Sequence, residues 1–367
     1  MNDLLCSATG VRYPSDTTQW RSAEQAPFDL DFAGHYEPDR TAQRPMTLWR
    51  YREALPFRAD VEPVTLGEGC TPLVPLQIDG LPVQAKLECL LPTGSYKDRG
   101  SSVLLTHLRE RGATSVINDS SGNAGASVAC YAARAGIDCG IYVPAGNAPA
   151  KLLQIELYGA TLHKVPGTRE DSTTACMGAV GGNTRYASHV WNPYFVQGCK
   201  TYLYEVYEQR GGKLPEALLF PVGNGALLLG SWLAMQELRD DGLIQQLPQL
   251  IAIQAETVAP LAQAWSGNTA DFESGVTAAE GIAVRQPARA GQILHAIRET
   301  NGRCLTVTES QIRAATLWAA AQGFCIEPTS ATTIAAVRAH NLQGDLVLAF
   351  TGNGLKAGSQ FMKWQGA

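Results

Sequence analysis

From residue 82 onward, short apolar runs alternate with longer segments in which apolar residues recur at the spacing of a helix. The short runs predict strands at 114–120, 139–144, 160–166, 217–222, 250–256 and 345–350. Helical spacing predicts helices at 100–108, 124–136, 148–159 and 223–238, and 305–323 reads as a strand followed by a helix. Because alternating strands and helices build β-α-β units on parallel sheets, the pattern predicts an α/β protein with two doubly wound open sheets.

The first 65 residues lack this rhythm. They are rich in Pro, Asp and Arg, and only 46–55 ("MTLWRYREAL") has helical spacing. We therefore expect an irregular arm with one helical piece. The 367 residues exceed what a single hydrophobic core usually spans, so the remainder is expected to form two domains.

Composition narrows the class of partner. The chain has 29 Lys and Arg against 34 Asp and Glu, without a basic run, which argues against nucleic acid. Its longest apolar stretches are interrupted by Gly and Pro well short of the roughly 20 residues that span a bilayer, and the start lacks a signal peptide's pattern. These features argue against a membrane partner and predict a cytoplasmic protein.

The nine cysteines and six histidines show no pattern of a metal site. The cysteines are odd in number and scattered, no two form a C-x-x-C pair, and no H-E-x-x-H is present. We expect reduced thiols and no metal.

Three glycine-rich turns each follow a predicted strand: 120–127 ("SSGNAGAS"), 221–230 ("PVGNGALLLG") and 351–354 ("TGNG"). Such turns present unpaired N–H groups to a ligand at the carboxyl edge of an open sheet, although each alone is also ordinary turn chemistry. The second turn does not match the G-x-G-x-x-G motif of dinucleotide-binding proteins, because the third glycine of that motif would fall at Leu228. A loop around a single phosphate fits better.

Lys97 lies in "GSYKDRG", directly before a predicted helix. At a helix start the dipole and the adjacent Arg99 oppose a positive charge and favour a neutral, nucleophilic amine. An exposed turn lysine is the commoner fate of this residue type, but the flanking Gly94 and Gly100 favour close approach of a ligand. Lys97 is therefore the candidate for a Schiff base.

Together these motifs resemble the threonine synthase family of fold-type II pyridoxal-phosphate enzymes, the tryptophan-synthase-β-like superfamily. The resemblance runs from about Thr65 to Lys356 and rests on "PTGSYKDRG", "SSGNAGASVACYAARAG", "NPYFVQGCKTYLYEV", "PVGNGALLLG", "GFCIEPTSAT" and "TGNGLK". It implies pyridoxal 5'-phosphate in the cleft between two domains. The expected boundaries are an arm at 1–65 packed on the large domain, a large cofactor domain at 66–90 and 192–367, and a small mobile domain at 91–191.

The resemblance also implies roles for single residues. Lys97 would form the Schiff base with the cofactor and act as the catalytic base, and Asn123 would hydrogen-bond the 3-oxygen of the cofactor ring. The loop around the 5'-phosphate would consist of Gly223, Asn224, Gly225, Ala226 and Leu227. Thr351 would face the pyridine nitrogen, and a hydroxyl there favours elimination over transamination or racemisation. Substrate would meet Ser120, Ser121, Ala124 and Phe195.

Two of these positions depart from the family pattern. Phe195 stands where threonine synthases usually have an arginine that grips the substrate phosphate, and Ala124 stands where they have a threonine. Each charge-assisted hydrogen bond typically contributes about 1.5–3 kcal/mol, so losing both would weaken phosphohomoserine binding. The segment "LLCSATGVRYP" resembles the family's C-x-x-C-G-x-x-Y knuckle with Thr9 at the second cysteine, which we interpret as a metal-free relic.

The leading hypothesis is a lyase or synthase that runs β- or γ-elimination, or elimination followed by replacement, on an amino acid. The alternatives within the enzyme class are a serine or threonine dehydratase and a β-replacing synthase of the cysteate synthase type. A phosphate-metabolite-binding protein without covalent catalysis is the alternative of another class. The expected partner is a small amino acid, with a homodimer left open.

Overall fold

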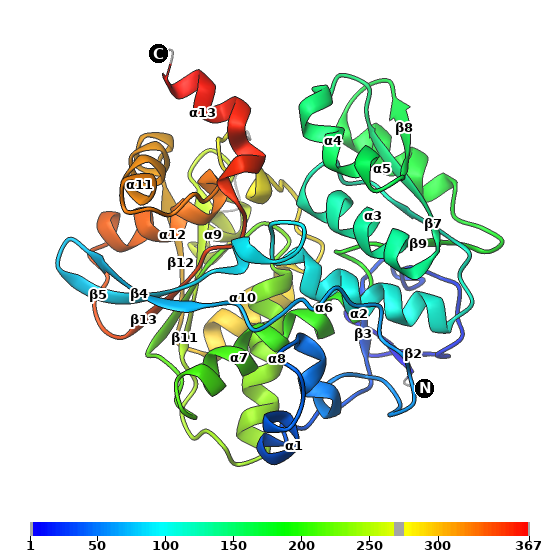
Figure 1. Ribbon diagram of the computed structural model, residues 1–367, viewed down its shortest axis with the longest axis horizontal. Helices are drawn as coiled ribbons and strands as arrows, with labels where there is room; N and C mark the ends of the chain where they lie inside the picture. Colours follow the sequence, from blue (N-terminus) through cyan, green and yellow to red (C-terminus); the bar gives the residue numbers. More distant parts are fainter. Residues whose placement is uncertain (1–2, 268–274, 366–367) are drawn as a thin grey trace. The chain divides into compact units, whose positions relative to one another are not determined.

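The computed structural model describes residues 3–267 and 275–365, which pack into two units (Figure 1). Unit 1 consists of residues 3–70 and 97–202, and unit 2 consists of 71–96 and 203–365. The chain therefore passes from unit 2 into unit 1 at the junction of Tyr96 and Lys97. The arm, large domain and small mobile domain expected from the sequence stay a prediction.

Unit 2 is built on a six-stranded sheet with the order β12-β11-β10-β13-β5-β4. Its strands are β4 (Leu73–Ile78), β5 (Leu81–Lys86), β10 (Ala217–Pro221), β11 (Gln249–Ala255), β12 (Arg303–Val307) and β13 (Leu346–Ala349). Only β4 is antiparallel to its neighbour. The carboxyl ends of β5, β10, β11, β12 and β13 consequently meet at one edge, where ligands bind in open α/β sheets.

Helices cover both faces of this sheet, because side chains that alternate along its strands are buried on either face. Leu219, Ile251 and Ile253 share one hydrophobic cluster with residues of α11 and α12, and the alternate positions Leu218 and Ala252 are equally buried on the other face. The helices and 3₁₀ turns of the unit are η2 (Glu88–Leu90), α7 (Thr201–Gln209), α8 (Ala226–Asp240), α9 (Pro260–Trp265), η3 (Glu280–Ile282), α10 (Ala290–Glu299), α11 (Glu309–Ala321), α12 (Pro328–Ala339), η4 (Gly354–Ala357) and α13 (Gly358–Gln365).

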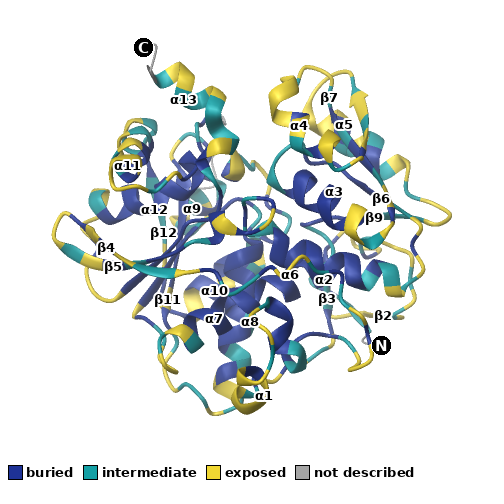
Figure 2. Cartoon of the chain, in the orientation of Figure 1, coloured by how far each residue is buried: buried dark blue, intermediate teal, exposed yellow. Residues whose placement is uncertain are grey.

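Unit 1 contains a second parallel sheet with the order β8-β7-β6-β9. The strands are β6 (Ser115–Asn118), β7 (Asp138–Pro144), β8 (Thr161–Val165) and β9 (Thr184–Tyr186), and the helices are α2 (Lys97–Glu110), α3 (Asn123–Ala135), α4 (Pro149–Leu157), α5 (Arg169–Gly178) and α6 (Pro193–Cys199). Ile141 of β7 packs with α3 and α4, whereas Ile117 of β6 packs with Cys176 of α5. In Figure 2, α2, α3 and α6 are largely dark blue, which marks them as the interior of the unit.

The arm of unit 1 is more regular than its sequence indicates. It holds a three-stranded antiparallel sheet of β1 (Leu4–Cys6), β2 (Arg12–Tyr13) and β3 (Phe28–Leu30), followed by α1 (Pro38–Ala42) and the 3₁₀ helix η1 (Leu48–Ala54). The expected helical piece at 46–55 is η1. Leu30, Leu48 and Trp49 pack with Val103 of α2 and Tyr194 of α6. The Cys6 thiol donates a hydrogen bond to Ser22 Oγ at 3.2 Å.

Throughout residues 3–267 and 275–365, no helix is both long and apolar enough to cross a bilayer.

Candidate active site

Two candidate site segments of unit 1 each follow one of two neighbouring strands, β6 and β9. Because β6 and β9 are parallel partners, the segments after Asn118 and after Tyr186 leave the sheet at the same edge. Asn118 ties them together: its Nδ2 donates to the carbonyl of Ala187 at 2.7 Å, and its Oδ1 accepts from the N–H of Ser120 at 2.9 Å. The glycine turn 120–123 and the segment 187–189 therefore lie beside each other.

Helices α2 and α3 are joined at their N-terminal turns. Ser127 of α3 donates its hydroxyl to Asp98 Oδ1 at 2.7 Å and is 2.8 Å from Ser101 Oγ, and Asp98 is fully buried. Lys97 begins α2 and Asn123 begins α3, so these hydrogen bonds bring the starts of the two helices together. The lysine and the asparagine, predicted from separate motifs, lie at adjacent helix starts.

Phe195 of α6 lies close to Lys97. Its ring is fully buried, and Lys97 Nζ is 5.6 Å from the ring centroid. A Cβ atom at position 100 would lie 2.5 Å from the Phe195 ring, so only glycine at 100 allows this approach of α6 to α2. Where the family pattern has an arginine, this chain thus presents the apolar ring of Phe195 to the Lys97 amine.

His189 is a site residue that the sequence reasoning missed. It follows β9 within the segment 187–189, is 5% exposed, and its ring is 6.0 Å from that of Phe195 in an edge-on arrangement. Burial, and then the charges of Lys97 and Arg169, hold the His189 pKa well below its ordinary value. In the sequence the histidines stand out only as possible metal ligands and form no such motif, so His189 carries no local signal.

In unit 2, the glycine turn and Thr351 follow neighbouring strands. Parallel pairing of β10 with β13 sends residues 222–225 and 350–354 out at the same sheet edge. Gly225 caps α8 with φ +73° and without a side-chain hydrogen bond, and the first turn of α8 contains no acidic residue. The N–H of Leu229 bonds to the Gly225 carbonyl, so the earlier N–H groups of the helix precede any helical acceptor. This loop suits a phosphate group.

Thr351 is buried beside the start of α12. Its hydroxyl is 3.1 Å from Ser330 Oγ, and its carbonyl accepts from the N–H of Tyr96 at 3.0 Å. Ser95 forms a bridge with Gly352, and the buried Ser95 Oγ has no hydrogen-bond partner. The segment after β13 is thus hydrogen-bonded to Tyr96, the residue directly before Lys97 in the chain.

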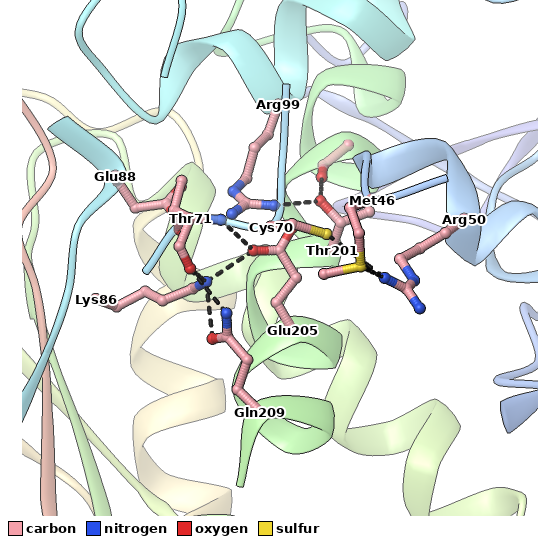
Figure 3. A network of polar contacts seen from close by, with 11 residues as sticks. Met46, Arg50, Cys70, Thr71, Lys86, Glu88, Arg99, Thr201, Glu205 and Gln209 are labelled. Atoms are coloured by element: carbon pink, nitrogen blue, oxygen red, sulfur yellow. Dashed lines mark hydrogen bonds and ion pairs between the residues drawn. The ribbon is translucent and has the colours of Figure 1, made fainter. Parts of the chain in front are cut away.

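A buried polar network supports the segment that leads to Lys97 (Figure 3). Lys86, the last residue of β5, donates to Glu205 Oε2 at 2.7 Å and to the carbonyl of Thr71 at 2.6 Å, and both charged side chains are almost completely buried. Thr71 also donates its hydroxyl to the buried Glu88 at 2.7 Å. The N–H of Cys89 bonds to the Phe350 carbonyl, which joins this network to the end of β13.

We expect Glu205→Gln to lower the free energy of unfolding of the cofactor-free protein by about 3–5 kcal/mol, because it leaves the Lys86 ammonium buried without its counter-charge. Urea unfolding measures this change. Asp79→Asn is the matched control: it breaks the more exposed Arg338–Asp79 pair of the same unit, at 2.8 Å, and should cost less than about 1 kcal/mol. Equal losses in the two variants would contradict the importance of the network.

The fold and these two groups of residues define a class of protein. The family model "Pyridoxal-phosphate dependent enzyme" matches residues 64–352, and the chain belongs to this family. The chain is 32% identical to the threonine synthase of Methanocaldococcus jannaschii, over 87% of this chain and 82% of that protein. It is 35% identical to the threonine synthase of Mycobacterium leprae, over 85% and 89% respectively. A fungal L-serine ammonia-lyase from Rhizomucor miehei has a TM-score of 0.70 at 20% identity, covering 82% of this chain and 99% of that one, which shows the shared fold.

These findings confirm several expectations from the sequence. The α/β fold-type II class, the threonine synthase family, the cofactor pyridoxal 5'-phosphate and a lyase acting on amino acids are confirmed. The site residues stay predictions. Unit 1 brings together Lys97, Ser120, Ser121, Asn123, Ala124 and Phe195, and unit 2 brings together Gly223, Asn224, Gly225, Ala226, Leu227 and Thr351.

Proposed function

We propose that Lys97 holds the cofactor aldehyde and that Asn123 hydrogen-bonds its ring oxygen. Their adjacent helix starts support this assignment, since Ser127 ties α3 to α2 one residue after Lys97. The N–H groups of residues 223–227 bind the phosphate, which is supported by the uncapped start of α8. Ser120 and Ser121, in the turn before Asn123, bind the carboxylate end of the substrate.

Pyridoxal phosphate supplies an electron sink that stabilises negative charge on the substrate Cα. The Nζ of Lys97 would remove the Cα proton of the bound amino acid. Thr351 offers the ring nitrogen a hydroxyl that lies 3.1 Å from Ser330 Oγ. A neutral partner at this nitrogen favours loss of a β- or γ-substituent over transamination or racemisation.

The substrate is an amino acid whose leaving group is not a phosphate. The observation that carries this proposal is the buried ring of Phe195, 5.6 Å from the Lys97 amine. A dianion placed there without partners is strongly disfavoured. Ala124, at the start of α3, adds no hydroxyl. Lys200 does not replace the missing cation, because it is fully buried with its amine over Phe32.

We expect kcat/KM for phosphohomoserine to be at least about a hundredfold below that of the best unphosphorylated substrate, since two charge-assisted hydrogen bonds are absent. The experiment presents the purified holoenzyme with phosphohomoserine, phosphoserine, serine and threonine, and measures release of phosphate, ammonia and 2-oxo acid. Efficient release of phosphate and threonine from phosphohomoserine would overturn the proposal and would assign threonine synthase activity to the protein.

We also propose that the protein works in the cytoplasm. Its nine cysteines are free thiols, as expected in a reducing compartment. Independence from nucleic acid and a homodimeric state stay predictions, to be tested by binding assay and by sedimentation.

A further inference from the structure

The buried imidazole of His189 has an unsatisfied polar atom. Its Nδ1 is inaccessible to solvent and lacks a hydrogen-bond partner. A buried polar atom without a partner is unfavourable, and most such atoms in folded proteins are paired. A ligand that supplies the missing hydrogen bond would remove this penalty.

The surroundings of His189 place that ligand at the site of Lys97. The segment 187–189 leaves the sheet beside the turn that begins with Ser120, through the shared contact with Asn118. His189 and Lys97 both lie close to the ring of Phe195, at centroid distances of 6.0 Å and 5.6 Å. The imidazole therefore lines the same part of unit 1 as the reactive amine.

The chemistry of the pair His189 and Phe195 limits what can bind. Burial and the positive charges of Lys97 and Arg169 hold the His189 pKa well below its ordinary value, which favours the neutral imidazole, with one donor and one acceptor nitrogen. Phe195 offers only apolar surface. Arg169 is exposed at the start of α5, where Glu170 and Asp171 follow it in the first turn.

We propose that His189 is a specificity-determining residue that hydrogen-bonds, through Nδ1, an uncharged oxygen on the substrate side chain. The substrate class is an amino acid with a β- or γ-hydroxyl or O-acyl group, such as serine, threonine or O-acetylserine. The inference rests on the proposed function and concerns the same site. It adds His189 as the residue that hydrogen-bonds the leaving group of the substrate.

The test compares the wild-type holoenzyme with His189→Phe and His189→Asn on four substrates. Serine, threonine and O-acetylserine carry the side-chain oxygen, and β-chloroalanine has a leaving group without one. We expect His189→Phe to raise KM for the preferred oxygen substrate by about tenfold or more, the equivalent of one buried hydrogen bond, while β-chloroalanine changes less than about threefold. The amide of His189→Asn should recover part of the loss. His163→Asn, at an exposed histidine stacked on Tyr142 in the same unit, should leave all four substrates unchanged.

Two results would overturn the inference, and they are distinguishable. Equal losses on serine-type substrates and β-chloroalanine in His189→Phe, or full activity of that variant on every substrate, would show that His189 does not read the side-chain oxygen. Absence of wild-type turnover with all four substrates, together with efficient use of phosphohomoserine, would reject the proposed function and the inference with it. The visible absorbance of the cofactor, recorded for each variant, identifies any variant that has lost the site; if both His189 variants have lost it, the role of His189 is structural and the inference is rejected.

Discussion

Replacing Lys97 by alanine abolishes turnover and the visible absorbance that the lysine-linked cofactor gives the protein. The expected loss of kcat is at least about a thousandfold, because one substitution removes both the covalent attachment and the base. The fold should persist: Lys97 is the first residue of α2, and alanine is favourable in a helix. Absorbance spectra and steady-state kinetics of the purified variant measure the effect.

Lys213→Ala provides the control, because Lys213 is an exposed residue outside the helices and strands of unit 2. It should retain both absorbance and activity. A Lys97→Ala protein that still forms a borohydride-reducible link to the cofactor would place the reactive amine elsewhere.

Asn224→Asp should weaken cofactor binding by on the order of a hundredfold or more, since it brings a negative charge to the loop proposed to hold the phosphate. The change is nearly isosteric. A carboxylate just before the start of α8 is favourable for the helix dipole, so the stability of the cofactor-free protein should not fall. Titration of that protein with pyridoxal phosphate and urea unfolding separate the two effects.

Asn224→Ser is the neutral control and should lose far less affinity. Substitution of the neighbouring Gly225 is a poorer test: its φ is +73°, and a Cβ there would lie 2.4 Å from Ile293, so the variant would also be strained. Unchanged affinity in Asn224→Asp would move the phosphate to another loop.

The fold was predictable where apolar runs were long and regular. β10 and β13 lie within the expected segments, β11 begins one residue before its segment, and α3 and α8 begin within three residues of their predicted starts. β9 was missed because three residues, "TRY", carry no periodicity, and its pairing with β6 depends on the tertiary fold. The small antiparallel sheet of the arm was missed for the same reason: β2 has only two residues.

Candidate site residues could be predicted from the sequence only where they belong to a local motif. Lys97 and the glycine turn around Gly225 are predicted from local sequence, because turn chemistry and a lysine between glycines leave a local signature, whereas Asn123 is predicted from the family resemblance; all three roles stay predictions. His189 left none: its significance lies in burial and in a missing partner, both of which depend on contacts with distant segments. The network of Lys86 and Glu205 likewise joins residues 119 positions apart.

The most direct test of the account is identification of the lysine that holds the cofactor. The holoenzyme is reduced with borohydride, which makes the link permanent, then digested and examined by peptide mass spectrometry. The account predicts one pyridoxyl-modified peptide, with the modification on Lys97. Modification of a different lysine, or a protein that binds pyridoxal phosphate without any reducible link, would contradict it.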